Sequence, residues 1–287
     1  MQARVDDLHP GVAERSGDDL RTSIVAVETG LRDHYSDLPG HCRQYMDVLL
    51  RVIGSSPAWP NAGGAHSGYL VEGPGRLLLD CGPGVLARLR QVEPWPQIDA
   101  IAITHLHLDH WGDLVPWVWG SRFRVGDAIA KPELWLGPGV REDLRAIGTR
   151  LGTPDMFETT FGVREYRPGE RFRAAGFEVL PVAVRHYGMP TVGFRVETDG
   201  RSLAYSGDAA PAPCLVELAR DVDLFVCEAT LLHGDDDGIP RGHLSADEAV
   251  EAFEAAGARR LLLTHRPEEL SVGPGLELAH DGLEVNV

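Results

Sequence analysis

Residues 105–110 read His-Leu-His-Leu-Asp-His, which places three imidazoles and one carboxylate directly after the apolar run 98–104. Imidazole nitrogen is the commonest protein ligand for zinc, and carboxylate oxygen also binds it well. Side chains at positions i and i+2 of an extended segment point the same way, so His105 and His107 can hold one metal ion together. If the backbone then turns, Asp109 and His110 can reach a second ion. The stretch therefore predicts a metal centre; a polar loop after a strand is the alternative, and it would suit a lone histidine better.

The pattern His-X-His-X-Asp-His after a strand resembles the signature of the metallo-β-lactamase superfamily at every position. The resemblance covers residues 46–287 and implies an α/β protein with an αββα four-layer sandwich. It also implies three further ligands, each after a later strand. Candidates occur in the expected order: His186 follows the alternating apolar run 177–185, Asp208 closes the run 202–208, and His265 ends the run 260–265.

The resemblance divides these side chains between two metal ions that share a bridging carboxylate. The first ion would be held by His105, His107 and His186, the second by Asp109, His110 and His265, and the bridge would be Asp208. Borderline ligands of this kind favour two zinc ions, with manganese or iron as alternatives. Such a pair lowers the pKa of a bound water to near 7, and Asp109 could orient that nucleophile. Asp80, at the end of the apolar run 77–79, matches a family aspartate that supports the metal-binding loop; a structural cap is the alternative.

A second pair of residues resembles ribonuclease Z and its close relatives. Glu228 closes the apolar run 224–228, and His243 precedes the expected helix 246–256. In those enzymes a glutamate and a histidine at matching positions pair, and the histidine protonates the leaving oxygen. A carboxylate partner raises the pKa of a histidine and fixes its orientation. Taken singly, Glu228 and His243 would be read as a polar strand end and a loop histidine.

The charge and cysteine content limit the classes of function. The 287 residues carry a formal net charge of −16, which repels nucleic acid unless a local basic patch overrides it. The four cysteines show no Cys-X-X-Cys spacing. With no N-terminal apolar signal and no apolar run of about 18 residues, we expect a cytoplasmic protein that does not enter the membrane.

The remaining pattern predicts one large domain with strands in clusters between helices. Residues 1–45 are polar and weakly periodic, so we expect a loosely ordered extension; an added helix is the alternative. The domain 46–287 should begin with a strand at 47–54 and a hairpin at 67–80, whereas 152–168 resists assignment. Further strands are expected at 98–104, 132–136, 177–185, 192–198, 202–206, 224–228 and 260–264, and helices at 85–92, 112–124, 140–151, 214–220 and 246–256.

These features predict a dinuclear metal-dependent hydrolase that resembles ribonuclease Z and acts on a phosphodiester. The substrate would be a small or cyclic nucleotide or an RNA 3′ end, with Asp109, His243 and Glu228 as catalytic residues. The basic arm that grips transfer RNA in ribonuclease Z has no obvious counterpart, since 131–173 is close to neutral, which argues against transfer RNA. Two other classes stay open: a lactone, ester or thioester hydrolase on the same metal pair, and a non-catalytic metal-binding sensor. Family relatives are often dimers, so a homodimer is a further expectation.

Overall fold

The computed structural model describes residues 47–124 and 131–287. The extension expected at residues 1–45 lies outside the described residues, so its predicted looseness stays a prediction. All elements below belong to the unit that starts at Gln44 and ends at Val287.

The first sheet has seven strands in the order β14-β1-β2-β3-β4-β5-β6. The strands β3, β4, β5 and β6 run parallel, and the other neighbours pair antiparallel. The strands are β1 Leu49–Gly54, β2 Gly68–Glu72, β3 Arg76–Leu79, β4 Ala100–Ala102, β5 Glu133–Leu136, β6 Gly162–Glu165 and β14 Glu284–Asn286.

The second sheet also has seven strands, in the order β13-β12-β11-β10-β9-β8-β7. The strands β10, β11, β12 and β13 run parallel, whereas β7, β8, β9 and β10 pair antiparallel. They are β7 Phe172–Ala174, β8 Phe177–His186, β9 Met189–Thr198, β10 Arg201–Tyr205, β11 Leu224–Glu228, β12 Leu261–Thr264 and β13 Glu277–Leu278.

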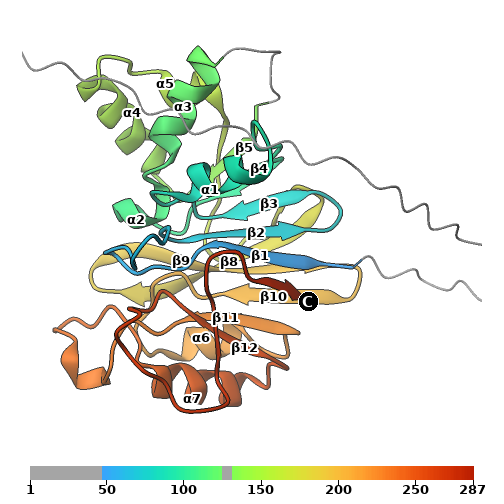
Figure 1. Cartoon of the computed structure of the whole chain (residues 1–287), viewed down its shortest axis with the longest axis vertical. Helices are drawn as coiled ribbons and strands as arrows, with labels where there is room; N and C mark the ends of the chain where they lie inside the picture. Colours follow the sequence, from blue (N-terminus) through green and yellow to red (C-terminus); the bar gives the residue numbers. More distant parts are fainter. Residues whose placement is uncertain (1–46, 125–130) are drawn as a thin grey trace, which may run out of the picture. The chain divides into compact units, whose positions relative to one another are not determined.

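Helices cover the outer face of each sheet, which gives the αββα sandwich that the family resemblance implies (Figure 1). The helices before β8 are α1 Val85–Val92, α2 Leu108–Trp111, α3 Leu114–Phe123, α4 Val140–Arg150 and α5 Met156–Thr160. The later ones are α6 Pro213–Leu218, the short 3₁₀ helix η1 Gly234–Asp236 and α7 Ala246–Ala256. Within the described part of the chain, no helix is long and apolar enough to cross a membrane.

Three hydrophobic clusters match the three interfaces of this sandwich. One fills the space between the sheets, and Leu50, Val71, Phe194 and Val226 belong to it. The alternation of buried and half-buried residues in β1 shows one face turned to this cluster. The other two clusters lie under α1 to α5 and under α6 and α7. Apolar packing therefore holds the two sheets together independently of any polar site.

Strand direction explains why the polar side chains meet. The carboxyl ends of parallel strands lie at one edge of a sheet, which holds for β3, β4, β10, β11 and β12. Two successive antiparallel pairings, β8 with β9 and β9 with β10, give β8 the same direction as β10. His186 at the end of β8 thus shares an edge with the residues after β10, β11 and β12.

The region that resisted assignment, 152–168, holds the short helix α5 and the edge strand β6. Both elements have five or fewer residues, so neither repeats a pattern long enough to read. Phe157 and Phe161, which are buried with α3 and α4, fix this region in place.

We expect Phe194→Ala to lower the free energy of unfolding by about 3–5 kcal/mol, because it leaves a cavity between the sheets. Phe194 is fully buried and packs edge-on against Tyr166 at 5.4 Å. Chemical denaturation measures the change, with Val92→Ala on an exposed helix position as the control. A loss below about 1 kcal/mol would show that the sheets do not rely on this packing.

Candidate metal centre

The predicted ligands lie together where the strands end at the common edge of the two sheets. His107 is half-buried and the other six side chains are buried. His105 and His107 lie between β4 and α2, Asp109 and His110 lie in α2, His186 ends β8, Asp208 follows β10, and His265 follows β12.

Three imidazoles and one carboxylate oxygen form the first group of ligand atoms. His107 Nδ1 lies 3.0 Å from His105 Nε2 and 2.8 Å from His186 Nε2. Asp208 Oδ2 lies 3.8 Å from each of His105 Nε2 and His186 Nε2. A tetrahedral zinc ion with ligands at about 2.0–2.1 Å separates neighbouring ligand atoms by roughly 3.3 Å. The spacing of this group therefore suits one such ion.

The second group has two imidazoles and two carboxylate oxygens. Asp109 Oδ2 lies 3.4 Å from His110 Nε2 and 3.2 Å from His265 Nε2. Asp208 Oδ1 lies 3.2 Å from His110 Nε2 and 3.5 Å from His265 Nε2. Because the two oxygens of Asp208 face different groups, its carboxylate can join two ions. The structure thus brings all seven predicted ligands into the two predicted sets.

Two atoms of these groups test whether a metal fits. His110 Nε2 and Asp208 Oδ1 are buried and lie 3.2 Å apart, yet neither atom makes a hydrogen bond to the described residues. A buried polar atom without a partner costs free energy, so an ion between these atoms would relieve both. The donor set of imidazole and carboxylate suits zinc, as well as manganese and iron. The residues therefore fit two divalent cations.

Hydrogen bonds at the opposite ring nitrogens hold the imidazoles in place. His110 Nδ1 lies 2.7 Å from Asp80 Oδ2, and His186 Nδ1 lies 2.7 Å from the carbonyl oxygen of Gly242. Both acceptors require a proton on Nδ1, which leaves the lone pair of Nε2 free for a metal.

Asp80 follows β3 in the left-handed region at φ 59° and is fully buried. Its carboxylate also accepts the backbone N–H of Thr104 at 2.8 Å and the hydroxyl of Tyr205 at 2.8 Å. Asp80 is thus placed to support the metal-binding loop and to join the two sheets, rather than merely to cap β3.

Burial lowers the pKa of His105, His107 and His186, and His105 is affected most strongly. These imidazoles are therefore neutral near pH 7. A neutral imidazole is the form that binds a metal, so no proton has to be displaced from them.

Glu228 and His243 are paired beside both ligand groups. His243 Nδ1 lies 2.9 Å from Glu228 Oε1, and its ring packs 4.9 Å from His186 and 5.7 Å from His265. Burial alone would lower the pKa of His243, but the carboxylates of Glu228, Asp208 and Asp237, Glu228 most of all, outweigh it and raise the pKa to about 9. His243 is therefore a protonated donor at neutral pH, held within reach of whatever binds at the ligand groups.

Thr230 links this pair to the metal ligands. Its hydroxyl donates to Glu228 Oε2 at 2.8 Å and accepts from His265 Nδ1 at 2.8 Å. One carboxylate thus orients both a candidate acid and a candidate ligand. Sequence reasoning did not assign Thr230, although a hydroxyl two residues after a strand-end glutamate was a readable signal.

Two further residues that sequence reasoning missed hold the loop of His243. Asp237 Oδ2 accepts the backbone N–H groups of Gly242 at 2.6 Å and His243 at 2.9 Å, while Asp237 Oδ1 accepts the hydroxyl of Tyr187 at 3.1 Å. The Tyr187 ring lies 5.5 Å from the His243 ring. A Cβ at Gly242 would lie 2.4 Å from the Tyr187 ring, so this packing needs glycine. No local pattern could reveal contacts between residues 50 positions apart.

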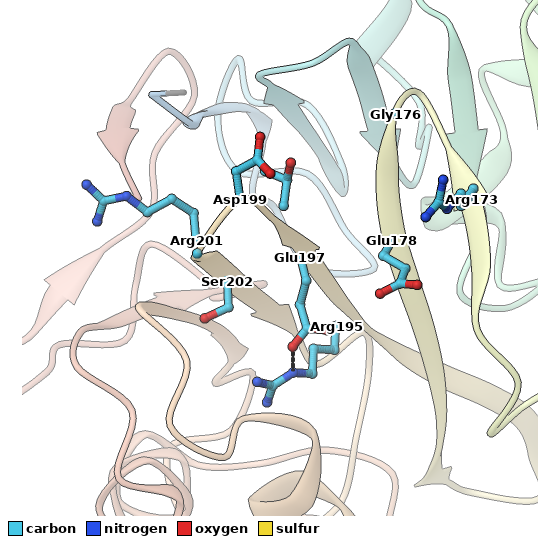
Figure 2. Close-up of a pocket in the computed structure, with 10 residues that line it drawn as sticks. Arg173, Gly176, Glu178, Arg195, Glu197, Asp199, Arg201 and Ser202 are labelled. Atoms are coloured by element: carbon cyan, nitrogen blue, oxygen red, sulfur yellow. Dashed lines mark hydrogen bonds and ion pairs between the residues drawn. The ribbon is translucent and has the colours of Figure 1, made fainter. Parts of the chain in front are cut away.

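A hollow of about 510 Å³ lies at the end of β8 and β9 away from His186 and Met189 (Figure 2). Three of its charged side chains are in ion pairs: Arg195 pairs with Glu197 at 2.6 Å, and Glu178 lies 3.5 Å from Arg171. None of the ligand residues lines it. Its size would suit a ligand, but its paired charges indicate surface ion pairs rather than a reaction site.

We expect zinc to raise the melting temperature of chelator-treated protein. At 1,000 times Kd, bound metal contributes about 4 kcal/mol, or roughly 10 °C for a domain of this size. Asp208→Ala should bind less zinc and lose most of this shift, whereas His280→Ala, at an exposed histidine, should keep it. Metal content is measured by mass spectrometry. An unchanged shift and an unchanged zinc content in Asp208→Ala would exclude the bridging role.

Comparison with known proteins agrees with this geometry. The family model described as "Beta-lactamase superfamily domain" matches residues 75–266. The chain is 36% identical over 232 residues to "Uncharacterized protein ML1173" of Mycobacterium leprae, with 77% of this chain and 78% of that protein covered. It is 31% identical over 260 residues to "Ribonuclease Z" of Mycobacterium bovis, with 79% and 88% covered.

Among solved structures, the crystal structure of the metallo-β-lactamase fold protein YhfI from Bacillus subtilis aligns with a TM-score of 0.70 at 23% identity. That alignment covers 83% of this chain and 99% of the YhfI chain. The fold, the strand-end ligand groups and the family match agree, and the chain belongs to the beta-lactamase superfamily.

Proposed function

We propose that this protein is a metal-dependent phosphodiesterase that is similar to ribonuclease Z and that cleaves a small phosphodiester. The observation that supports this most is the pair formed by the buried Glu228 and the half-buried His243 beside the ligand groups, at 2.9 Å. An alkoxide leaving group needs a proton as it departs, so a general acid speeds diester cleavage.

The two ligand groups would hold the metal ions that activate the nucleophile. A zinc pair bound there would provide hydroxide at neutral pH and neutralise charge on the phosphate oxygens. Asp109, whose Oδ2 faces His110 and His265, would orient the attacking oxygen as well as bind metal. His243 would then donate its Nε2 proton to the leaving oxygen, and Glu228 would stabilise the imidazolium through Nδ1.

Charge favours a small diester over RNA as the substrate. The formal net charge is −16, and tight RNA binding needs lysine and arginine to neutralise phosphates. The β8–β9 hairpin, which borders the site, turns over only Tyr187 and Gly188, since His186 pairs with Met189. A cyclic or short nucleotide needs no further binding arm. The cytoplasmic location and the homodimer stay predictions.

We expect His243→Ala to lower kcat on an unactivated diester, such as a cyclic nucleotide, by about 10²–10⁴-fold, because the acid is lost. An activated p-nitrophenyl diester needs no proton, so its turnover should change far less. Initial rates on both substrates with zinc-loaded protein measure the difference. His233→Ala is the matched control, since that histidine is exposed and lies outside the ligand groups.

Two outcomes would contradict the proposal. Hydrolysis of a lactone or thioester with an inert diester would place the protein among the ester hydrolases. Zinc binding without turnover of any of these substrates would favour the metal-binding sensor.

We expect Asp237→Ala to reproduce part of the His243→Ala effect, because it frees the two backbone N–H groups that position His243. The loss should again fall on unactivated diesters, by about tenfold or more, with zinc content unchanged. Tyr187→Phe keeps the ring beside His243 and should cost less than Tyr187→Ala. Equal losses on activated and unactivated diesters would show that the loop acts on the fold rather than on the acid.

A further inference from the structure

An apolar pocket of about 170 Å³ lies beside His105 at the edge of the sheets. Five segments of the chain form it: residues 103–105 after β4, residues 137–140 from the end of β5 to the start of α4, residues 166–168 after β6, residues 183–184 of β8, and residues 189–192 at the start of β9. We call it the His105 pocket. His105 is the one predicted metal ligand in its wall, so the pocket borders the first ligand group.

The rim of the His105 pocket is rigid. Three exposed prolines lie on it, namely Pro138, Pro168 and Pro190. Proline has a fixed φ, so each of these positions loses little conformational freedom when a ligand binds. The buried Tyr166 and Val192 form the inner wall. The pocket is therefore formed in advance of binding.

The hydroxyl groups in the wall already have acceptors inside the protein. Tyr166 donates to the carbonyl oxygen of Ile103 at 2.7 Å, and Thr191 donates to that of Met189 at 3.2 Å. Thr104 donates to Asp80 at 3.0 Å. The pocket thus offers a ligand apolar contact and shape rather than side-chain hydrogen bonds, so it suits a group that needs none.

The pocket and the candidate acid lie on different sides of the β8–β9 turn. Tyr187, on one side, contacts the His243 ring, whereas Met189, on the other, lines the pocket. Neither Glu228 nor His243 is among the lining residues. A substituent held in the pocket would therefore not be the one whose oxygen faces His243.

We propose that the His105 pocket binds the substituent that stays on the phosphorus, an apolar group about the size of one six-membered ring. A cavity of about 150 Å³ with apolar walls holds a benzene molecule, so the volume suits one ring but not two. This inference rests on the proposed phosphodiesterase function and names the substrate class more closely: diesters with a phenyl-like retained group.

The test uses two diesters that share the p-nitrophenyl leaving group and differ in the retained group, methyl or phenyl. Val140→Phe and Ala183→Leu fill the pocket from different segments, at a half-buried and an exposed position. We expect each to lower kcat/KM for the phenyl diester by about tenfold or more, with little change for the methyl diester. The quantity compared between variants is the ratio of kcat/KM for the phenyl diester to kcat/KM for the methyl diester. This comparison cancels the intrinsic difference in reactivity between the two diesters.

Val92→Phe makes the matched change at a position that is 87% exposed and outside the pocket, and should leave the ratio unchanged. The inference would be overturned if Val140→Phe and Ala183→Leu both lowered kcat/KM for the methyl and phenyl diesters by the same factor. It would also be overturned if neither substitution lowered kcat/KM for either diester. If the wild type cleaves neither diester, the proposed function fails, and binding then decides the pocket separately. Phenylphosphonate should raise the melting temperature of zinc-loaded wild type more than methylphosphonate does, and the filled variants should lose that difference; equal shifts in the wild type would overturn the inference.

Discussion

The position of Asp208 is the constraint on which the site depends. Its two carboxylate oxygens face separate groups of imidazoles, at 3.2 Å from His110 and 3.8 Å from His105. A carboxylate that is 2% exposed is costly to bury unless positive charge surrounds it. Two cations would supply that charge, whereas hydrogen bonds within the described residues leave Oδ1 without a partner. The ligand groups, the outer hydrogen bonds and the acid pair are all arranged around this one residue.

The edge that carries the site also joins the two sheets. Asp80 comes from the first sheet, yet it accepts the hydroxyl of Tyr205 from β10 of the second. Tyr69 on β2 reaches Thr264 at the end of β12 in the same way, at 2.6 Å. These bonds fix the distance between strand ends that supply ligands from different sheets. Rigid support of this kind is what a site needs if its ligand atoms are to stay within tenths of an ångström of the required geometry.

The sequence alone was sufficient to predict the candidate ligands, because each of them belongs to a local pattern. Residues 105–110 carry their own spacing, and the later ligands each end an apolar run, so the resemblance could place His186, Asp208 and His265. Contacts between distant segments were out of reach. The Thr230 bond to His265 spans 35 positions, and the Tyr187 bond to Asp237 spans 50. The His105 pocket joins five segments that no periodicity connects. Short elements could not be predicted for a related reason, since the helix and strand within 152–168 contain too few residues to show a repeat.

Anomalous diffraction at the zinc absorption edge, from crystals of the zinc-loaded protein, tests the central claim most directly. We predict two peaks about 3.5–4 Å apart, one bound by His105, His107 and His186 and the other by Asp109, His110 and His265, with one oxygen of Asp208 bound to each. A single peak, or two peaks with neither bound to Asp208, would contradict the bridging carboxylate and the reaction built on it.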